Sequence, residues 1–205
     1  MFVKRLFDIS VSFIGIILFF PLMIAVGIII KLTSKGPIIF KQIRVTKNGK
    51  HFEIYKFRTM KENSEGNKQI TVGNDMRITG IGKILRKTKL DELPQLFNVI
   101  KGEMSLVGPR PEVPKYIDLY SDEQKKILNV PAGMTDYASI YFSNESELLG
   151  KAEDPEKFYI EKIMPYKIEL NQKYIENISI FTDIKIIILT ILKIAGFIKL
   201  EPKEF

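Results

Sequence analysis

Two adjacent carboxylates, Asp91 and Glu92, are the residues in this sequence whose types and spacing best suit chemistry. No acidic residue stands between Asp75 and Asp91, so the pair follows a basic stretch, and a Gly-Pro-Arg-Pro segment at 108–111 comes shortly after it. A carboxylate can act as a nucleophile or bind a hard cation such as Mg²⁺, and arginine binds phosphate oxygens through two parallel hydrogen bonds. The combination indicates phosphoryl transfer, with a plain helix-capping role for Asp91 as the alternative.

Cations elsewhere in the chain could complete such a site, namely Lys56, Arg58, Arg86 and Arg110. Pro109 and Pro111 flank Arg110, and because each proline fixes φ, this arginine should be held on a stiff backbone. We expect Asp91 to begin a helix whose dipole keeps it ionised, and Glu92 to accept a proton or orient a second group.

The composition narrows the class of protein. The 205 residues carry a formal charge of +7, which suits one domain with an appendage and an anionic partner, such as nucleic acid, acidic lipid or a phosphorylated substrate. Nucleic acid is disfavoured because the N-terminus is apolar and no known binding motif is present. The absence of cysteine excludes disulfides and thiolate ligands, and the single histidine, His51, lies in a strand-like run where a structural or exposed role is expected.

The N-terminal segment predicts membrane association. Residues 9–30 contain no charge, and as a helix these 22 residues would measure about 33 Å. Pro21 should kink that helix, and basic residues flank it on both sides, with Lys4 and Arg5 before it and Lys31 and Lys35 after it. From the residues alone, a re-entrant helix that returns to the same face and an ordinary membrane-crossing helix both stay open. A cleaved signal peptide fits less well, because no small-residue cleavage site follows the run.

The remaining chain predicts a mostly helical domain with one β-hairpin. Asn48-Gly49 predicts a type I′ turn within residues 38–60, and a polar loop is expected at 64–75. Helices are expected at Ile78–Lys89 with a basic face, from Asp91 to Gly102 with Pro94 in the first turn, at Asp122–Leu128, and at Pro155–Asn177, bent or interrupted at Pro165. The segment at 183–200 predicts an amphipathic helix, either interfacial or in the core, that is too short to span a membrane.

Four blocks of this sequence resemble the bacterial sugar transferases, which are monotopic phosphoglycosyl transferases. They are KRLFDISVSFIGIILFFPLM, YKFRTM, RITGIGKILRKTKLDELPQLFNVIKGEMSLVGPRPE and AGMTDYASIYF, and the resemblance extends over nearly the whole chain. The resemblance implies an α+β fold, with a re-entrant membrane helix kinked at Pro21 in residues 1–35. A cytoplasmic catalytic domain with interfacial amphipathic helices would occupy 36–205. Members lie on the cytoplasmic face of the bacterial inner membrane.

The resemblance also implies a reaction and roles. A sugar phosphate passes from a UDP-sugar to undecaprenyl phosphate, UMP leaves, and the product begins a surface glycan. Asp91 would form a covalent phosphosugar intermediate and help to hold Mg²⁺, while Glu92 would assist the lipid phosphate. The resemblance places Lys56, Arg58, Arg86, Pro109, Arg110, Pro111 and Thr135 at the substrates. The loop at 132–139 departs from the family, with Ala132 where proline is frequent and Asp136 where glycine is frequent.

An alternative from a different class is a non-catalytic adaptor that binds anionic membrane lipids through its basic face, with Asp91 as a helix cap. A conventional glycosyltransferase would also use a UDP-sugar but would release UDP. Neither the sugar nor the oligomeric state follows from the sequence, and a homodimer is one option.

Overall fold

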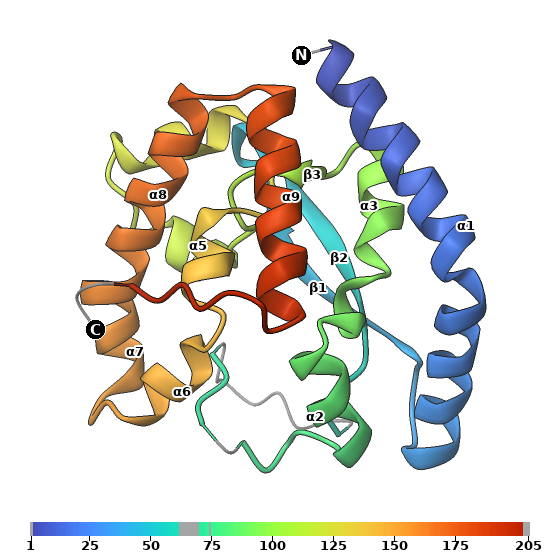
Figure 1. Ribbon diagram of the computed structural model, residues 1–205. Coiled ribbons are helices and arrows are strands. Elements are labelled where there is room, and N and C mark those ends of the chain that lie inside the picture. Colours follow the sequence, from blue (N-terminus) through green and yellow to red (C-terminus); the bar gives the residue numbers. More distant parts are fainter. Residues whose placement is uncertain (1, 62–69, 74, 203–205) are drawn as a thin grey trace.

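The computed structural model describes residues 2–61, 70–73 and 75–202 (Figure 1). The helices are α1 (Phe2–Thr33), α2 (Gly80–Lys87), α3 (Gln95–Lys101), α4 (Pro114–Ile117), α5 (Tyr137–Tyr141), α6 (Glu145–Gly150), α7 (Pro155–Phe158), α8 (Met164–Glu176) and α9 (Ile180–Ile194). The strands are β1 (Ile39–Val45), β2 (His51–Phe57), β3 (Ser105–Val107) and β4 (Gly133–Thr135). Short helical turns lie at Lys47–Gly49, Leu90–Glu92, Gln124–Asn129 and Tyr159–Ile163. The mostly helical α+β architecture with a small hairpin is therefore confirmed.

Strands β1 and β2 form the predicted antiparallel hairpin, with Val45 opposite His51. Asn48 and Gly49 both have positive φ, 58° and 71°, as a type I′ turn requires, because asparagine and glycine tolerate that region. His51 is exposed, as expected. Along β2 the side chains of Phe52 and Ile54 are buried on the face that alternation also gives to Lys56, so the strand directs this lysine inward.

A second sheet was not predicted. Strands β3 and β4 pair in parallel, and each has only three residues, too short for an alternation signal. The backbones of these two segments approach so closely that a Cβ on Gly133 would lie 2.1 Å from the backbone nitrogen of Gly108. Glycine is therefore required at this crossing, which joins the start of the Gly-Pro-Arg-Pro segment to the loop at 132–139.

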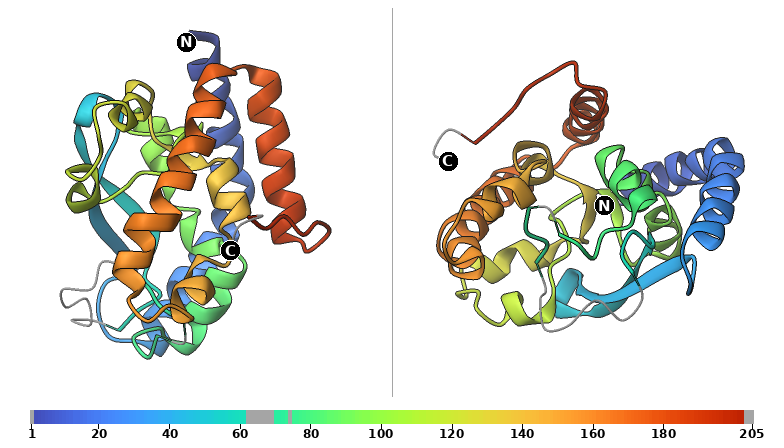
Figure 2. Two further views of the ribbon diagram at one scale, coloured as in Figure 1. Left: turned by 90° about the vertical axis from the view of Figure 1, so that its left-hand side faces the viewer. Right: turned by 90° about the horizontal axis from the view of Figure 1, so that it is seen from below.

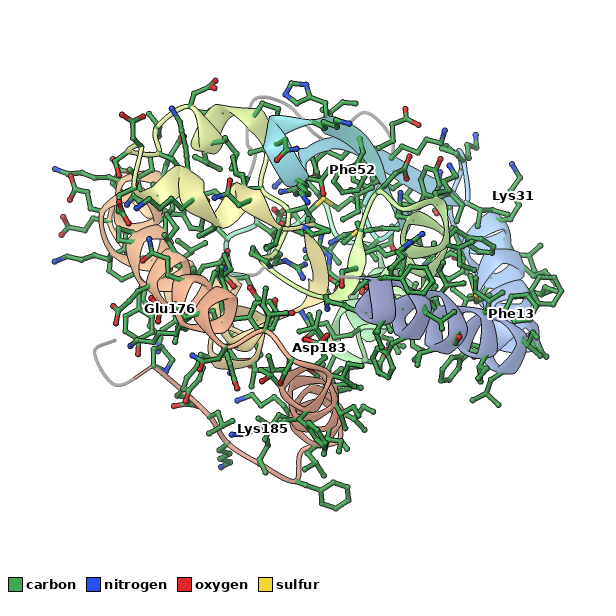
Figure 3. All side chains as sticks on the ribbon, turned by 90° about the horizontal axis from the view of Figure 1, so that it is seen from above. Phe13, Lys31, Phe52, Glu176, Asp183 and Lys185 are labelled. Atoms are coloured by element: carbon green, nitrogen blue, oxygen red, sulfur yellow. The ribbon has the colours of Figure 1, made fainter. Side chains whose placement is uncertain are left out.

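Helix α1 is continuous from Phe2 to Thr33, includes Pro21, and is long and apolar enough to cross a membrane by length and composition. Seen from above, its ribbon runs in one direction near Phe13 and in another near Lys31 (Figure 3). Near its end, three residues, Met23, Val26 and Ile30, pack against Phe57 and Leu85. Most other apolar side chains of α1 are exposed, including Phe13, which is 58% exposed. The helix ends near the predicted boundary at residue 35, although the division into two domains stays a prediction.

Helix α9 lies on the opposite side of the molecule from the β1–β2 hairpin in both views of Figure 2. Ile186 is fully buried and belongs to the same core cluster as Val107 of β3 and Tyr174 of α8. The exposed apolar side chains of α9 and the residues after it are Phe181, Ile184, Ile188, Ile191, Ile194 and Phe197. The predicted amphipathic character is therefore present, with one face in the core and one open.

Several predicted helices differ in extent or type. α2 begins at Gly80 because Thr79 caps it through the backbone nitrogen of Gly82, and Ile84, expected on its apolar face, is 58% exposed. The helix expected at 122–128 is a 3₁₀ turn. The segment 155–177 is interrupted near Pro165, as predicted, by a π-helical turn that ends at Ile163. Pro165 lies in the first turn of α8, where its missing N–H costs little. Most of the loop expected at 64–75 lies outside the described residues.

Candidate active site

Asp91 lies in the 3₁₀ turn Leu90–Glu92, not at the start of a helix as predicted. Lys89 ends the preceding segment in the left-handed region, with φ 57°, and Pro94 takes the N-cap position of α3. Because α3 starts four residues later than expected, its dipole does not begin at Asp91. The side chain is 7% exposed, and its Oδ1 has no hydrogen-bond partner among the described residues.

The pKa of Asp91 shifts in the direction opposite to the one that a helix dipole would give. Burial, together with the neighbouring negative charge of Glu92, raises the pKa of Asp91, although Lys56, Lys89 and Arg86 oppose the shift. A buried carboxylate with a free oxygen and a raised pKa is costly for the fold, and such groups cluster at functional sites. The plain capping role is therefore wrong.

Glu92 is the centre of a charge cluster. Its Oε1 accepts hydrogen bonds from Arg110 Nη2 at 2.6 Å and from Lys56 Nζ at 3.2 Å, and Arg110 Nη1 lies 3.5 Å from Oε2. Burial alone would raise the pKa of Glu92, but the guanidinium and the ammonium outweigh it and hold that pKa well below its usual range. A carboxylate in this state is a weak proton acceptor, so the geometry favours an organising role over the predicted basic one.

The two cations respond in opposite ways. Burial lowers the pKa of Lys56 to about 8, although the charge of Glu92 raises it. For Arg110 the charge of Glu92 is the larger influence and raises the pKa. Both cations therefore face one carboxylate, and only Lys56 can lose its proton near neutral pH.

The backbone around Arg110 is fastened on several sides, as the prolines predicted. The carbonyl of Pro109 accepts from the backbone nitrogen of Gly133 at 2.8 Å, and the carbonyl of Pro111 accepts from Arg44 at 3.3 Å. The backbone nitrogen of Arg110 donates to Asp136 Oδ2 at 3.2 Å. Arg110 is thus held on a rigid loop that aims its side chain at Glu92.

Arg86 and Arg58 lie in the wall formed by α1, β2 and α2. Arg86 donates to the hydroxyls of Thr59 and Thr71, and its charge reaches Asp91. Arg58 is buried and donates through Nη2 to the carbonyl and hydroxyl of Ser34 at the end of α1, while its Nε and Nη1 have no partner among the described residues. The structure therefore joins Arg86 to the site through its charge and ties Arg58 to Ser34 at the end of α1.

Thr135 does not join the cluster through its side chain. Its hydroxyl lies 2.6 Å from the hydroxyl of Thr190 on α9, and only its carbonyl serves the site, by accepting from Gly108.

Asp136 was not predicted as a site residue. It is fully buried and caps α5 through the backbone nitrogen of Ser139 at 2.6 Å while it holds Arg110. The departure of this loop from the resemblance described above was the available signal.

The donor set limits how a metal could bind. No group of three or more His, Cys, Asp or Glu side chains that could hold a metal occurs within residues 2–61, 70–73 and 75–202. Mg²⁺ is commonly held by one or two carboxylates together with water and substrate phosphates. The unpartnered Oδ1 of Asp91 fits that mode of binding.

Comparison with known proteins identifies the family of this chain. The bacterial sugar transferase family matches residues 1–196. Over 194 residues the chain is 42% identical to a UDP-N-acetylgalactosamine-undecaprenyl-phosphate N-acetylgalactosaminephosphotransferase of Aeromonas hydrophila, covering 93% of this chain and 43% of that protein. Over 200 residues it is 40% identical to a UDP-glucose:undecaprenyl-phosphate glucose-1-phosphate transferase of Klebsiella pneumoniae, covering 95% of this chain and 40% of that protein.

A third relative is close in length. The sugar transferase EpsL of Bacillus subtilis is 37% identical over 196 residues, covering 95% of this chain and 88% of that protein. The chain thus spans about two fifths of the first two relatives and most of the third. Because the family match includes the acidic pair, its cations and the apolar helix, the chain belongs to the bacterial sugar transferase family.

Proposed function

We propose that this protein transfers a sugar phosphate from a UDP-sugar to undecaprenyl phosphate and releases UMP. The observation that carries the proposal is the buried Asp91, with a free carboxylate oxygen, beside a Glu92 that is paired with two cations. The names of two relatives support it, since they describe transfer of glucose 1-phosphate or N-acetylgalactosamine phosphate to undecaprenyl phosphate.

In the proposed reaction, a carboxylate oxygen of Asp91 forms a bond to the phosphorus that carries the sugar. The bond from that phosphorus to the oxygen bridging the two phosphates breaks, and UMP leaves with the electron pair. A phosphate oxygen of undecaprenyl phosphate then attacks the same phosphorus, and the bond to Asp91 breaks to restore the carboxylate. Dividing the transfer in this way is covalent catalysis.

The cations of the cluster would bind the diphosphate. Arg110 presents a planar fork on a rigid loop, and Lys56 is a compact charge on the same side of Glu92. Glu92 keeps these two like charges together before the substrate arrives, so the site is preorganised for an anion. Arg86 would add positive charge near Asp91, and Arg58 would do so near the end of α1.

Mg²⁺ is part of the proposal. Asp91 would hold it through the carboxylate oxygen that has no partner, and substrate phosphate oxygens and water would complete its coordination. When bound, the ion would neutralise negative charge on the diphosphate.

The exposed apolar surfaces suit a lipid substrate. A polyprenyl phosphate carries its phosphate at the headgroup level, so an enzyme that rests at that level need not extract the lipid. We propose that α1 enters one leaflet as a re-entrant helix and that the open face of α9 lies at the interface. The catalytic residues would then lie on the cytoplasmic face of the inner membrane.

The test is to measure UMP and UDP separately. Purified protein in detergent or nanodiscs is incubated with undecaprenyl phosphate, Mg²⁺ and a panel of UDP-sugars. We expect lipid-dependent UMP with at least one sugar, and none from Asp91→Asn. Release of UDP would instead indicate sugar transfer without its phosphate. If folded protein releases neither UMP nor UDP with any sugar, the proposal is wrong, and a non-catalytic adaptor that binds membrane lipids becomes the better explanation.

A further inference from the structure

We infer that Lys4 and Arg5, at the start of α1, are positioning residues that tie the membrane helix to both chain segments of the active site. One segment carries Asp91 and Glu92, and the other carries Arg110. The inference rests on the proposed function where turnover is measured, but the contacts themselves can be tested without it.

Arg5 fastens the segment that carries the acidic pair. Its Nη1 donates to the carbonyl of Val99 at 2.6 Å, and its Nη2 donates to the carbonyl of Ile100 at 2.9 Å. These carbonyls belong to the last turn of α3, where few backbone donors remain and where positive charge is favourable. The carbonyl of Val99 also accepts from the backbone nitrogen of Gly102 at 3.0 Å. Because α3 begins at Gln95, just after Glu92, fixing its far end restricts how the acidic pair can move.

Lys4 fastens the segment that carries Arg110. Its Nζ lies 2.5 Å from Asp183 Oδ2 and donates to the carbonyl of Val107 at 3.1 Å. Val107 is the last residue of β3, and the Gly-Pro-Arg-Pro segment starts at the next residue.

Tyr174 lies at the same junction. Its hydroxyl is 2.7 Å from Asp183 Oδ1 and 3.1 Å from the carbonyl of Val107, but it has one proton to give. Because the distance to Asp183 is shorter, the tyrosine hydroxyl donates its hydrogen bond to Asp183. The ammonium of Lys4 has enough protons to donate to both Asp183 and Val107. Lys4 is therefore the donor that links α1, β3 and α9.

A third polar residue of α1 extends the same contact. Asp8 Oδ2 accepts from the hydroxyl of Ser105 at 2.8 Å, and Oδ1 accepts from the backbone nitrogen of Leu106 at 3.3 Å. Lys4, Asp8 and Ser12 are spaced by four residues, so they share one face of the helix, and Asp8 and Ser12 are buried. Lys4 and Asp8 of this stripe contact β3, and the nearby Phe7 and Val11 pack against the core, while most other apolar side chains of α1 are exposed.

The burial of the Lys4 side chain distinguishes a positioning role from a role in setting the orientation of α1 in the membrane. A basic flank that only sets orientation needs charge near the headgroups, and its side chains can stay in water. The Lys4 side chain is 17% exposed and is paired with an Asp183 carboxylate that is fully buried. In contrast, the neighbouring Val3 is 61% exposed, so a lysine placed there would keep the charge of the flank but lose the contact.

The experiment uses that difference. Three full-length variants are compared. Val3→Lys/Lys4→Met keeps the charge of the N-terminal flank, and Lys4→Arg keeps a donor that can reach Asp183 and the carbonyl of Val107. Lys185→Met removes an exposed lysine from α9 and is the matched control. Each variant is assayed for UMP release and for hydrogen–deuterium exchange in peptides covering residues 90–112, with α8 as the internal reference.

We expect turnover of Val3→Lys/Lys4→Met to fall on the order of 10- to 100-fold, because small misplacements of catalytic groups have effects of that size. Exchange at 103–112 should quicken while exchange in α8 stays unchanged. Lys4→Arg should restore most of the turnover, and Lys185→Met should match the wild type.

Wild-type turnover and exchange in Val3→Lys/Lys4→Met would overturn the inference. If that variant does not fold, Asp183→Asn tests the same contact with the flank unchanged, and wild-type behaviour there would also overturn it. If the wild type releases no UMP, the proposed function fails, and the exchange result alone decides whether Lys4 positions the segment.

Discussion

Replacing Glu92 by glutamine distinguishes an organising carboxylate from a catalytic base. The substitution keeps the shape but removes the charge that two cations share, at 2.6 Å from Arg110 and 3.2 Å from Lys56. The glutamate side chain is 13% exposed, so water replaces little of the lost attraction. Removing one partner of a buried ion pair lowers the free energy of unfolding by about 3–5 kcal/mol. The amide oxygen of glutamine still accepts a hydrogen bond, so we expect a loss of about 3 kcal/mol for Glu92→Gln.

The same change should alter the chemistry of the first step. Without Glu92, Lys56 and Arg110 repel each other and the pKa of Lys56 falls below its present value of about 8. At pH 7.5 a smaller fraction of the protein then carries positive charge on both Lys56 and Arg110, so the site binds a diphosphate less well. Rapid-quench measurement with UDP-sugar and no lipid should therefore show a smaller and slower burst of UMP from Glu92→Gln than from the wild type.

A matched control is Glu53→Gln, which removes a carboxylate from an ion pair with Lys41 that is about half exposed. Since exposed pairs contribute little, denaturant unfolding of this variant should not differ from the wild type. The reasoning is refuted if Glu92→Gln gives a full UMP burst and loses only the transfer to lipid, because Glu92 would then act as the base for the lipid phosphate.

Three further predictions concern Asp91, Lys56 and the β3–β4 crossing. The folded-state pKa of Asp91 is raised above its unfolded value, so ionisation of Asp91 at pH 7 costs stability. The variant Asp91→Asn should therefore unfold at a higher denaturant concentration than the wild type at pH 7, but not at about pH 3. It should release no UMP at either pH. Because Lys56 must stay charged, kcat/KM should fall above about pH 8, and Lys56→Arg should remove that fall. Gly133→Ala places a Cβ 2.1 Å from the nitrogen of Gly108 and should cost about 1–3 kcal/mol in thermal unfolding, whereas Gly80→Ala, with open space around it, should cost nothing.

The local elements that were predicted correctly carry their signal in neighbouring residues. The Asn48-Gly49 turn follows from the tolerance of these two residues for positive φ. Gly102 ends α3 with φ 88° for the same reason. The extent of the apolar N-terminal helix follows from a run without charge. The sheet of β3 and β4 escaped prediction because its strands have three residues each and pair across the intervening chain.

The state of the acidic pair could not be read from its neighbours. The prediction for Asp91 used the dipole of a helix that begins further on, and it omitted burial, which raises the pKa instead. The sequence left two roles open for Glu92, proton acceptor or orienting group, because its partners lie 36 and 18 residues away in the chain.

The sequence by itself determined which residues are available for chemistry, the apolar N-terminal helix and the short-range turns, because these depend on residue type and on contacts between near neighbours. Only the tertiary structure decided which carboxylate is free and which is paired, and that Lys4 and Arg5 point into the protein. The physical reason is that desolvation and Coulomb interactions depend on distances through space, and the fold sets these distances between segments far apart in the chain.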